Sequence, residues 1–192
     1  MSENLICIGS GKALAYIRGD LRRATKSLFL VGPWIDDYVA EQLVLVAPKK
    51  LDARVLIRPE KQVQSDVWNR ILTALYIFAD HWDNFEVRVL ERLHAKCLCI
   101  DSHVVYVGSA NWYRYSLEES MEVVLRGNVD GIYGIDKELE GLWEKGEILK
   151  ISGTSSIMKT TPATGITKEV LDPIALRTLK QNPKAFVLGK KK

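Results

Sequence analysis

Residues 94–111 read HAKCLCIDSHVVYVGSAN, and this stretch carries the clearest local pattern in the chain. It contains two largely apolar runs, at 95–100 and 104–107, which are separated by only three residues at 101–103. A connection this short joins antiparallel neighbours, so the stretch predicts a β-hairpin. Its polar residues lie at the turn and at the open end of the hairpin, where the first strand begins and the second ends.

The open end of this hairpin carries groups that suit a phosphate. His94 and Lys96 are two residues apart, so on a strand their side chains leave the same face, about 6 to 7 Å apart along the chain. The returning strand delivers Ser109 and Asn111 into the next loop, where hydroxyl, amide and backbone N–H groups can surround one anion. Neutral imidazole is nucleophilic near pH 7, and a nearby cation and amide can stabilise charge on a phosphoryl group. The hairpin therefore predicts a phosphate site with His94 as the nucleophile.

The flanking sequence predicts strands that alternate with helices. Further strands are predicted at 27–31, 53–57, 85–90 and 122–125. Helices are predicted at 11–26, 38–47, 64–79 and 130–145, with Asp36 and Asp37 at the start of the second. This order predicts an α/β fold with a mixed, mostly parallel sheet flanked by helices on both faces. We expect one catalytic domain at 1–150, followed at 151–192 by a linker (152–165) and a basic tail with a short helix at 172–181.

The spacing H-x-K-x4-D-x6-G-S-x-N resembles the signature of the phospholipase D superfamily. The chain matches every fixed position of that signature, namely His94, Lys96, Asp101, Gly108, Ser109 and Asn111. Six positions at about one in twenty each would match by chance roughly once in 10⁵ to 10⁶ chains of this length. The resemblance implies a phospholipase D-like α/β sandwich and a phosphodiesterase that forms a covalent phosphohistidine. It also implies that the enzyme needs neither a metal ion nor another cofactor.

The same resemblance implies roles for the residues around the imidazole. His94, Lys96 and Asn111 would be catalytic, with His94 attacking phosphorus. Glu122 stands where the family often has a carboxylate that holds the imidazole in one tautomer. The family's typical Asn two residues before that carboxylate is Ser120 here.

Other positions are assigned to structure or to substrate binding. By resemblance, Asp101 ties the hairpin turn, and Gly108 lets the backbone pass close to the site. Ser109 would contact the phosphate. Arg92 lies two residues before His94 and is a candidate for a second phosphate contact.

The chain contains a single copy of the motif, because neither His81 nor His103 is followed by a lysine two residues later. In the family, the His of a second copy protonates the leaving oxygen. The resemblance to short single-motif nucleases therefore implies a homodimer in which two His94 residues face each other at the two-fold axis.

Aromatic residues follow two of the predicted strands. Trp34 and Asp36 come directly after the strand at 27–31, and residues 112–115 read WYRY, which includes Arg114. Aromatic rings interleaved with arginine can stack on bases and contact the phosphates of a single strand. The same residues can equally pack a dimer interface, and the sequence leaves both interpretations open.

The composition is that of an ordinary globular protein, with 47% hydrophobic and 27% charged residues. No apolar run approaches the roughly 20 residues that span a bilayer, and residues 1–11 lack the pattern of a secretory signal peptide. Cys97 and Cys99 are too close along one strand to form a disulfide, and the total of three cysteines is odd. We therefore expect a cytoplasmic protein without membrane contact, in which these two cysteines are core residues and not zinc ligands.

Charge is distributed unevenly along the chain. Residues 159–192 hold eight basic and two acidic residues, a net charge of +6, so the rest carries −3 within the total of +3. Basic side chains gain free energy by displacing counterions from phosphates, which makes nucleic acid a candidate partner of the tail. A solvated tail that only improves solubility is an equally good interpretation.

Three functions are consistent with these residues. A nuclease acting on DNA or RNA is favoured by the single motif, the small size and the basic tail. An enzyme that hydrolyses phospholipids would be expected to show two motifs, an amphipathic anchor or an export signal. A catalytically inactive relative that binds nucleic acid would not need an intact motif. The sequence therefore favours the nuclease.

Overall fold

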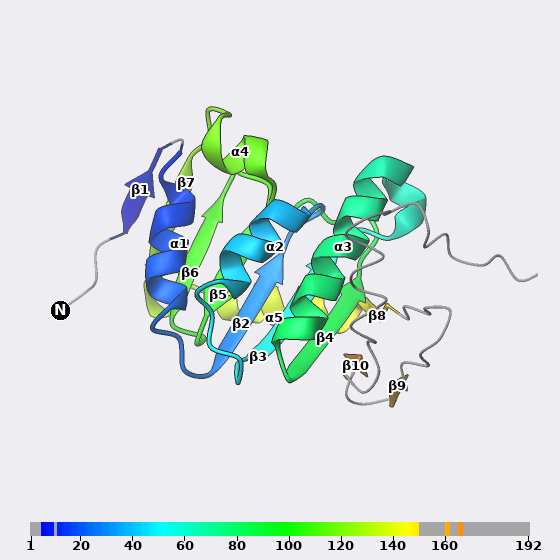
Figure 1. Ribbon diagram of the computed structural model, residues 1–192. Coiled ribbons are helices and arrows are strands. Elements are labelled where there is room, and N and C mark those ends of the chain that lie inside the picture. The colour runs from blue at the N-terminus through cyan, green and yellow to red at the C-terminus, as the bar shows by residue number, and fades with distance from the viewer. Residues whose placement is uncertain (1–4, 10, 150–159, 162–164, 167–192) are drawn as a thin grey trace, which may run out of the picture.

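The computed structural model describes residues 5–9 and 11–149 and two short strands, Thr160–Thr161 (β9) and Gly165–Ile166 (β10), which pair with each other (Figure 1). At its centre is an eight-stranded sheet in the order β1-β7-β6-β5-β2-β3-β4-β8. The strands are β1 (Ile6–Ile8), β2 (Ser27–Val31), β3 (Asp52–Ile57), β4 (Asn84–Val89), β5 (Cys97–Ile100), β6 (Val104–Gly108), β7 (Val124–Asn128) and β8 (Glu147–Ile148). The helices are α1 (Ala13–Leu21), α2 (Asp37–Val44), α3 (Ser65–His81), α4 (Arg114–Glu118) and α5 (Ile135–Lys145), with 3-10 turns at η1 (Glu60–Gln62) and η2 (Val129–Gly131).

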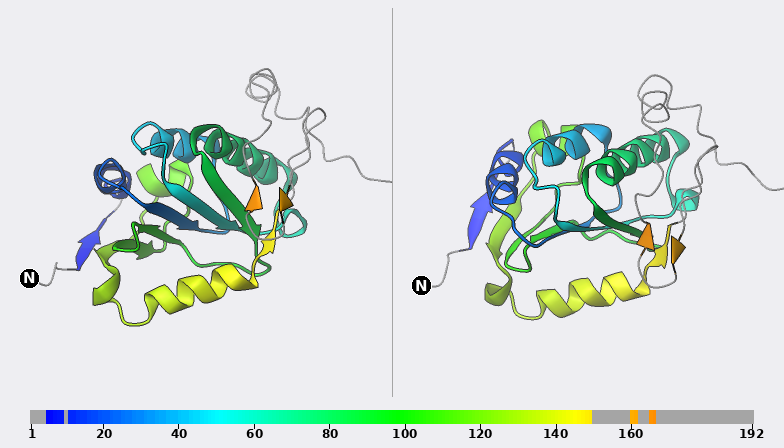
Figure 2. Two further views of the ribbon diagram at one scale, coloured as in Figure 1. Left: turned by 90° about the horizontal axis from the view of Figure 1, so that it is seen from below. Right: turned by 60° about the horizontal axis from the view of Figure 1, so that its bottom comes forward.

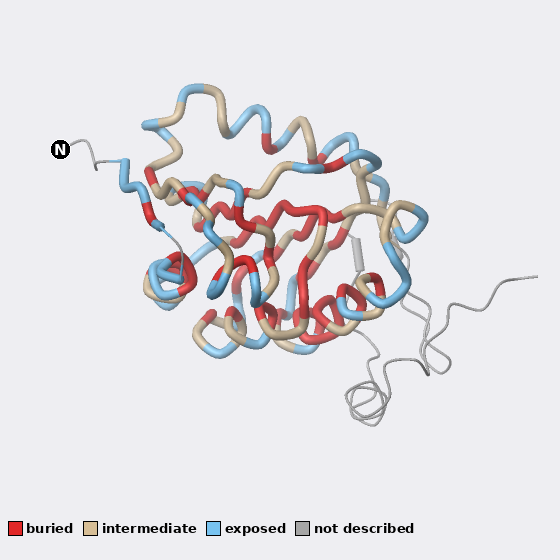
Figure 3. The backbone as a smooth tube through the Cα atoms, turned by 90° about the horizontal axis from the view of Figure 1, so that it is seen from above, coloured by how far each residue is buried: buried red, intermediate tan, exposed pale blue. Residues whose placement is uncertain are grey.

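Helices cover both faces of the sheet, as predicted. Figure 2 shows α1, α2 and α3 on one face and α5 on the other. Leu28 and Leu30 of β2 belong to the core beneath the first three helices. Phe29 lies between them in sequence and faces the other way, where its ring meets the edge of Trp143 in α5 at 5.3 Å between centroids. Buried residues run along the central strands, whereas most of α5 is exposed or half-buried (Figure 3).

The prediction of a mostly parallel sheet is wrong. Only β2–β3 and β3–β4 are parallel, and the other five neighbouring pairs are antiparallel. Parallel neighbours need a crossover connection, and here only α2 and α3 provide one between adjacent strands. The edge strands β1 and β8 are three and two residues long, and each adds an antiparallel pair. Strands this short carry no readable pattern of alternation.

The predicted hairpin is present as β5 and β6, in which Leu98 lies opposite Tyr106. The turn brings His103 N–H to the carbonyl of Ile100 at 3.0 Å, and its two central residues, 101 and 102, both have positive φ. Positive φ at both central positions is the feature of type I′ turns, whose twist matches that of the flanking strands.

Other differences lie at the ends of elements. Asp36 caps α2 as predicted by accepting the N–H of Val39 at 2.9 Å, but the helix ends at Val44, three residues earlier than expected. The helix predicted at 130–145 starts only at Ile135, because Gly134 has a φ of 81° and breaks the helical path. Helix α4 was not predicted.

The C-terminal predictions fall mostly beyond the described residues. The linker predicted at 152–165 contains β9 and the first residue of β10, and its other residues lie outside the described ranges. The helix predicted at 172–181 and the basic end of the chain lie outside them as well. None of the helices among the described residues is long and apolar enough to cross a bilayer.

Candidate active site

The candidate site lies at the edge of the sheet where the parallel strands β2, β3 and β4 end. Strand β4 lies two places to one side of β2, and β5 lies directly on the other side of it. The connection at 90–96 therefore returns past the ends of β3 and β2, and it carries the motif's first two residues. In open α/β sheets, ligands bind at the carboxyl ends of strands, at the point where connections diverge to opposite sides.

His94 is exposed, and its ring lies between two cations (Lys96 and Arg58). The Lys96 Nζ lies 3.0 Å from Nε2 and donates to the backbone carbonyl of His94 at 2.9 Å. Arg58, the first residue after β3, places Nη2 3.5 Å from Nδ1. Its Nε donates to the carbonyl of Leu93, which fixes the connection against the end of β3.

These two cations set the protonation state of the imidazole. Lys96 lowers the pKa of His94 most, and burial and Arg58 lower it further. The ring is therefore neutral at neutral pH, which is the form that can attack phosphorus. Burial lowers the pKa of Lys96, and Arg58 adds to the decrease, while Glu122 opposes it.

A second cluster lies beside the first, where β6 ends and β7 begins. Glu122 accepts hydrogen bonds from the hydroxyls of Ser109 and Ser116, the latter at 2.7 Å. Ser116 comes from α4, is fully buried, and also accepts the backbone N–H of Asn111 at 2.9 Å. The loop after the hairpin is thus tied to the carboxylate at two points.

Hydrogen bonding keeps the carboxylate of Glu122 ionised. Burial alone would raise its pKa, but the hydroxyls of Ser109, Ser116 and Ser120 and the charge of Lys96 outweigh burial, so the pKa is lowered. Ser120, at the position where the family typically has Asn, thus donates a hydrogen bond to this carboxylate. The contacts of the His94 ring within the described part of the chain are to cations, and the role of Glu122 as its orienting carboxylate stays a prediction.

Gly108 is required by the close approach of β6 and β7. A Cβ atom at this position would lie 2.2 Å from the carbonyl oxygen of Val123 and 2.8 Å from the Cα of Val124. The next residue, Ser109, bonds to that same carbonyl through its N–H at 3.1 Å. A side chain here would therefore push apart the two strands that hold Ser109 and Glu122.

Comparison with known proteins is consistent with this geometry. A family model described as "Cardiolipin synthase, PLD-like domain" matches residues 17–143. The chain belongs to the phospholipase D superfamily. A comparison with curated protein sequences gives no match.

Two solved structures share the fold of this phospholipase D-like domain. The first is the phospholipase D family member Nuc from Salmonella typhimurium, with a TM-score of 0.60 and 15% identity over 75% of this chain and 97% of that one. The second is NucT from Helicobacter pylori, with a TM-score of 0.58 and 16% identity over 74% of this chain and 98% of that one. At these identities the likeness concerns the fold alone.

The predicted substrate contacts of this phospholipase D-like domain are spread over the sheet edge. Trp34 is half-buried and lies beside the site, because the guanidinium carbon of Arg58 is 5.7 Å from the centre of its ring. Arg92 is exposed in a turn with a φ of 60°, and its N–H donates to Gln62 at 2.8 Å. Arg114 lies on the surface of α4, where its Nε is 3.2 Å from Glu118. Trp34 is therefore close to the imidazole, with Arg58 between them, whereas Arg114 pairs with Glu118 on the surface of α4.

The other aromatic residues after the motif are divided between core and surface. Trp112 is buried, and its Nε1 donates to the carbonyl of Val31 at 2.8 Å. A Cβ atom on Gly32 would lie 2.3 Å from the Trp112 ring, so the end of β2 is shaped around this indole. Tyr113 lines a cavity, and Tyr115 is exposed.

Cys97 and Cys99 are buried beneath α5, as predicted. Burial raises the pKa of each thiol to about 11, so both are protonated at neutral pH. Among the described residues, no group of three or more His, Cys, Asp or Glu side chains is placed to hold a metal ion.

Sequence reasoning missed Arg58 and Ser116. Arg58 had a usable signal, because it directly follows a buried strand that is parallel to the one before Trp34, and the ends of parallel neighbours meet at one edge. Ser116 had no such signal, because it approaches Glu122 only through the short helix α4, which the sequence did not predict.

Proposed function

We propose that this protein is a cytoplasmic, metal-independent phosphodiesterase that cleaves DNA or RNA internally, with an active site completed by a second copy of the chain. The observation that carries the proposal is the exposed His94 imidazole, held between Lys96 and Arg58 with a lowered pKa. Two cations that flank a neutral nucleophile are suited to a phosphodiester, which is anionic before attack and gains charge on its oxygens during attack.

The proposed reaction has two displacements. An imidazole nitrogen of His94 attacks phosphorus, so that a P–N bond forms while the P–O bond to the leaving strand breaks. The bound phosphodiester is an anion and offsets the repulsion from the flanking cations, so one of the two imidazoles can carry a proton in the complex. The partner subunit's His94, in this protonated form, gives its proton to the leaving oxygen. Water then attacks the phosphohistidine, gives its proton to that same imidazole of the partner subunit, and releases the phosphate on the other strand end.

The surface beside the site supports the dimer. Met121 and Val123, which flank Glu122, expose 95% and 54% of their surface. Large apolar side chains exposed next to charged groups are typical of interaction surfaces.

Phospholipid chemistry is the second candidate, because the matching family model is described as cardiolipin synthase. Both candidates use the same attack on a phosphodiester. They differ in what the surface next to His94 must bind, and one assay distinguishes them.

The test is cleavage of labelled single-stranded DNA, double-stranded DNA, RNA and phosphatidylcholine in excess EDTA. We expect a nucleic acid to be cut, and we expect the activity of the His94→Ala variant to be more than about 10³-fold lower than that of wild type. The matched control is His103→Ala, which removes another exposed imidazole, at the hairpin turn, and is expected to keep full activity. Activity that requires Mg²⁺ would contradict the proposal, and cleavage of the lipid alone would favour the second candidate.

The shared site is tested by mixing subunits. If both imidazoles are needed in each site, a dimer with one wild-type and one His94→Ala subunit is inactive. After equal amounts are mixed and exchanged, about one quarter of the dimers are wild type, so activity falls to about half of that expected for independent subunits. Activity that stays proportional to the amount of wild-type subunit, or a strictly monomeric protein in sedimentation, would refute the shared site.

A further inference from the structure

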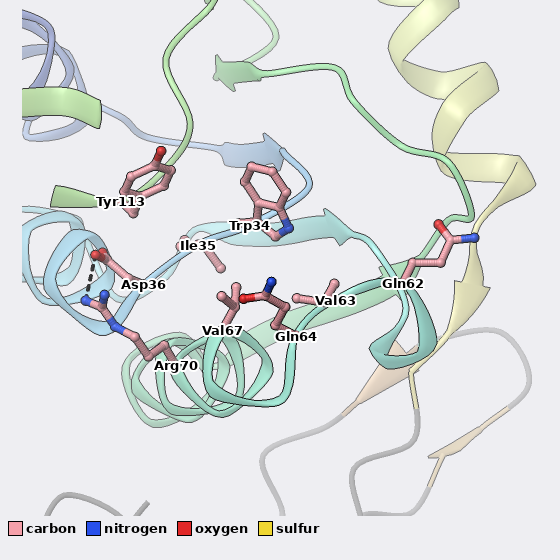
Figure 4. A pocket seen from close by; sticks show the side chains of 9 residues that line it. All are labelled: Trp34, Ile35, Asp36, Gln62, Val63, Gln64, Val67, Arg70 and Tyr113. Carbon is pink, nitrogen blue, oxygen red and sulfur yellow. Dashed lines mark hydrogen bonds and ion pairs between the residues drawn. The ribbon is translucent and has the colours of Figure 1, made fainter. Parts of the chain in front are cut away.

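A cavity of about 520 Å³ lies beside the proposed phosphate site (Figure 4). Trp34 forms one side of it, and the opposite side is formed by Val63 and Gln64, which directly precede α3, and by Val67 in its first turn. Tyr113 lies at one end, together with the ion pair between Asp36 and Arg70. Five of the nine lining residues are apolar or aromatic, and the polar ones are Asp36, Gln62, Gln64 and Arg70.

The end of the cavity near α2 is rigid, because Asp36 holds three segments together. Its carboxylate is almost fully buried and accepts the N–H of Val39, the N–H of Arg114 at 3.0 Å, and Nη2 of Arg70 at 2.8 Å. Its own N–H donates to the carbonyl of Trp112 at 3.0 Å. These bonds join α2, α3 and the loop after the motif, so the cavity is formed before any ligand arrives.

The polar group best placed to recognise a ligand is the amide of Gln64. This residue is the N-cap of α3, but its side chain makes no capping hydrogen bond. In Figure 4 its amide lies across the cavity from the Trp34 ring, between Val63 and Val67. A ligand that fits is flat enough to lie against an indole and has donors and acceptors along one edge, which an amide can pair.

Arg58 connects this cavity to the imidazole. Its guanidinium lies against the Trp34 ring and also reaches His94 Nδ1 at 3.5 Å. A phosphate held at His94 by this guanidinium would thus have Trp34 as its neighbour on the cavity side.

We infer that the cavity binds one unpaired nucleobase of the strand being cut, next to the phosphate that His94 attacks. The inference rests on the proposed function and adds to it that the substrate is single-stranded, because a paired base cannot enter a cavity of this kind without leaving its partner. Trp34 stacks on the base and Gln64 pairs with its edge. Both are binding residues that set specificity.

Binding by the full-length His94→Ala protein tests the inference without any cleavage. The probes are two fluorescent single-stranded oligonucleotides of one sequence, one intact and one with abasic sugars throughout its central part. We expect the intact strand to bind about 5- to 150-fold more tightly, the range that stacking of one base supplies. The added substitution Trp34→Ala should abolish this difference, whereas Trp34→Phe, which keeps a ring, should preserve part of it. The control Tyr133→Ala removes a fully exposed aromatic residue and should leave the difference unchanged.

Gln64→Ala provides a second variant, because Trp34 also packs against the core and its loss could unfold the protein. Gln64 is exposed, so its truncation should not unfold the protein. Without the amide that pairs with the base edge, the affinities for homopolymers of the four different bases should become more alike. Equal affinity of the His94→Ala protein for the intact and abasic strands overturns the inference, as does Trp34-dependent binding of short-chain phosphatidylcholine without base-dependent binding of the strand. If wild-type protein cleaves no nucleic acid but base-dependent binding persists, the proposed activity fails and the nucleobase site stands.

Discussion

The two ends of the β5–β6 hairpin differ in how their charged side chains are paired. At the turn, the carboxylate of Asp101 accepts three backbone N–H groups, from residues 25–27, at 2.8 to 2.9 Å. Burial would raise the pKa of Asp101, but these bonds outweigh burial and lower it. At the open end, His94, Lys96 and Arg58 bring groups of the same sign together, and the pKa of His94 is lowered by repulsion.

This difference indicates that Asp101 stabilises the fold, whereas Lys96 and Arg58 are placed to bind a ligand. The anion at the turn is satisfied by groups of its own chain, so its charge contributes to folding. The cations at the open end donate to backbone carbonyls, but they repel each other beside the imidazole, so an anion bound between them would stabilise both. A phosphate bound between Lys96 and Arg58 would also cancel the repulsion that lowers the pKa of His94. The comparison can be tested by removing charge from one end at a time.

The largest effect is expected from Lys96→Met at the open end. Loss of one preorganised group that stabilises developing charge costs about 10² to 10³-fold in kcat. The free energy of unfolding should change by less than about 0.5 kcal/mol, because the hydrogen bond from Lys96 to the His94 carbonyl is exposed and its charge is repelled by Arg58. Cleavage rates and urea unfolding curves measure the two quantities. A loss of stability comparable to the loss of activity would show that the two ends do not differ in this way.

The turn should respond in the opposite sense, with lost stability and retained activity. Asp101→Asn keeps an acceptor and a residue that tolerates positive φ, but it removes the charge from the three hydrogen bonds. We expect the free energy of unfolding at pH 7 to fall by about 1 to 3 kcal/mol, while kcat of the folded protein stays unchanged. Asp130→Asn, at an exposed position, is the control and should change stability by less than about 0.5 kcal/mol.

The pH dependence of this effect follows from the direction of the shift. Because the folded-state pKa of Asp101 is lowered, its contribution to stability is fully present above the unfolded-state pKa of about 3.9 and is lost as the pH falls through the folded-state value. The difference between wild type and Asp101→Asn should therefore shrink between pH 7 and pH 3. A difference that is constant over this range would mean that the charge of Asp101 is not the cause.

The hairpin could be predicted from the sequence, whereas the cavity and Arg58 beside it could not. The hairpin and its site residues lie within 94–111, so their relation is set by strand geometry and could be read locally. The parallel strand β2 and the Asp36 cap were also predicted correctly, because each depends on its own short stretch. By contrast, Arg58 lies 36 residues from His94, and the nearby cavity is lined from three separate stretches of chain. Such contacts depend on the order β5-β2-β3-β4 in the sheet, which no short stretch of the sequence specifies.

The smallest expected effect, and the sharpest test of the charge argument, comes from Arg58. Arg58→Gln removes one of the two cations near the imidazole, so the pKa of His94 should rise, by less than in Lys96→Met because Lys96 is the larger cause. The neutral ring is the nucleophile, so the acid limb of kcat/KM should move to higher pH in the same order. NMR titration of the ring protons measures the pKa directly, with His81 and His103 as references within the same molecule.

Arg58→Lys distinguishes charge from geometry at this position. Arg58 also donates to the Leu93 carbonyl, so its loss could shift the connection that carries His94 as well as remove a charge. Lysine keeps the charge and loses the fork of donors, so the pKa of His94 should stay near the wild-type value if charge is the cause. If Arg58→Lys raises that pKa as much as Arg58→Gln does, the position of the loop and not the repulsion between cations controls the imidazole. The contrast between the two ends of the hairpin would then rest on Lys96 alone.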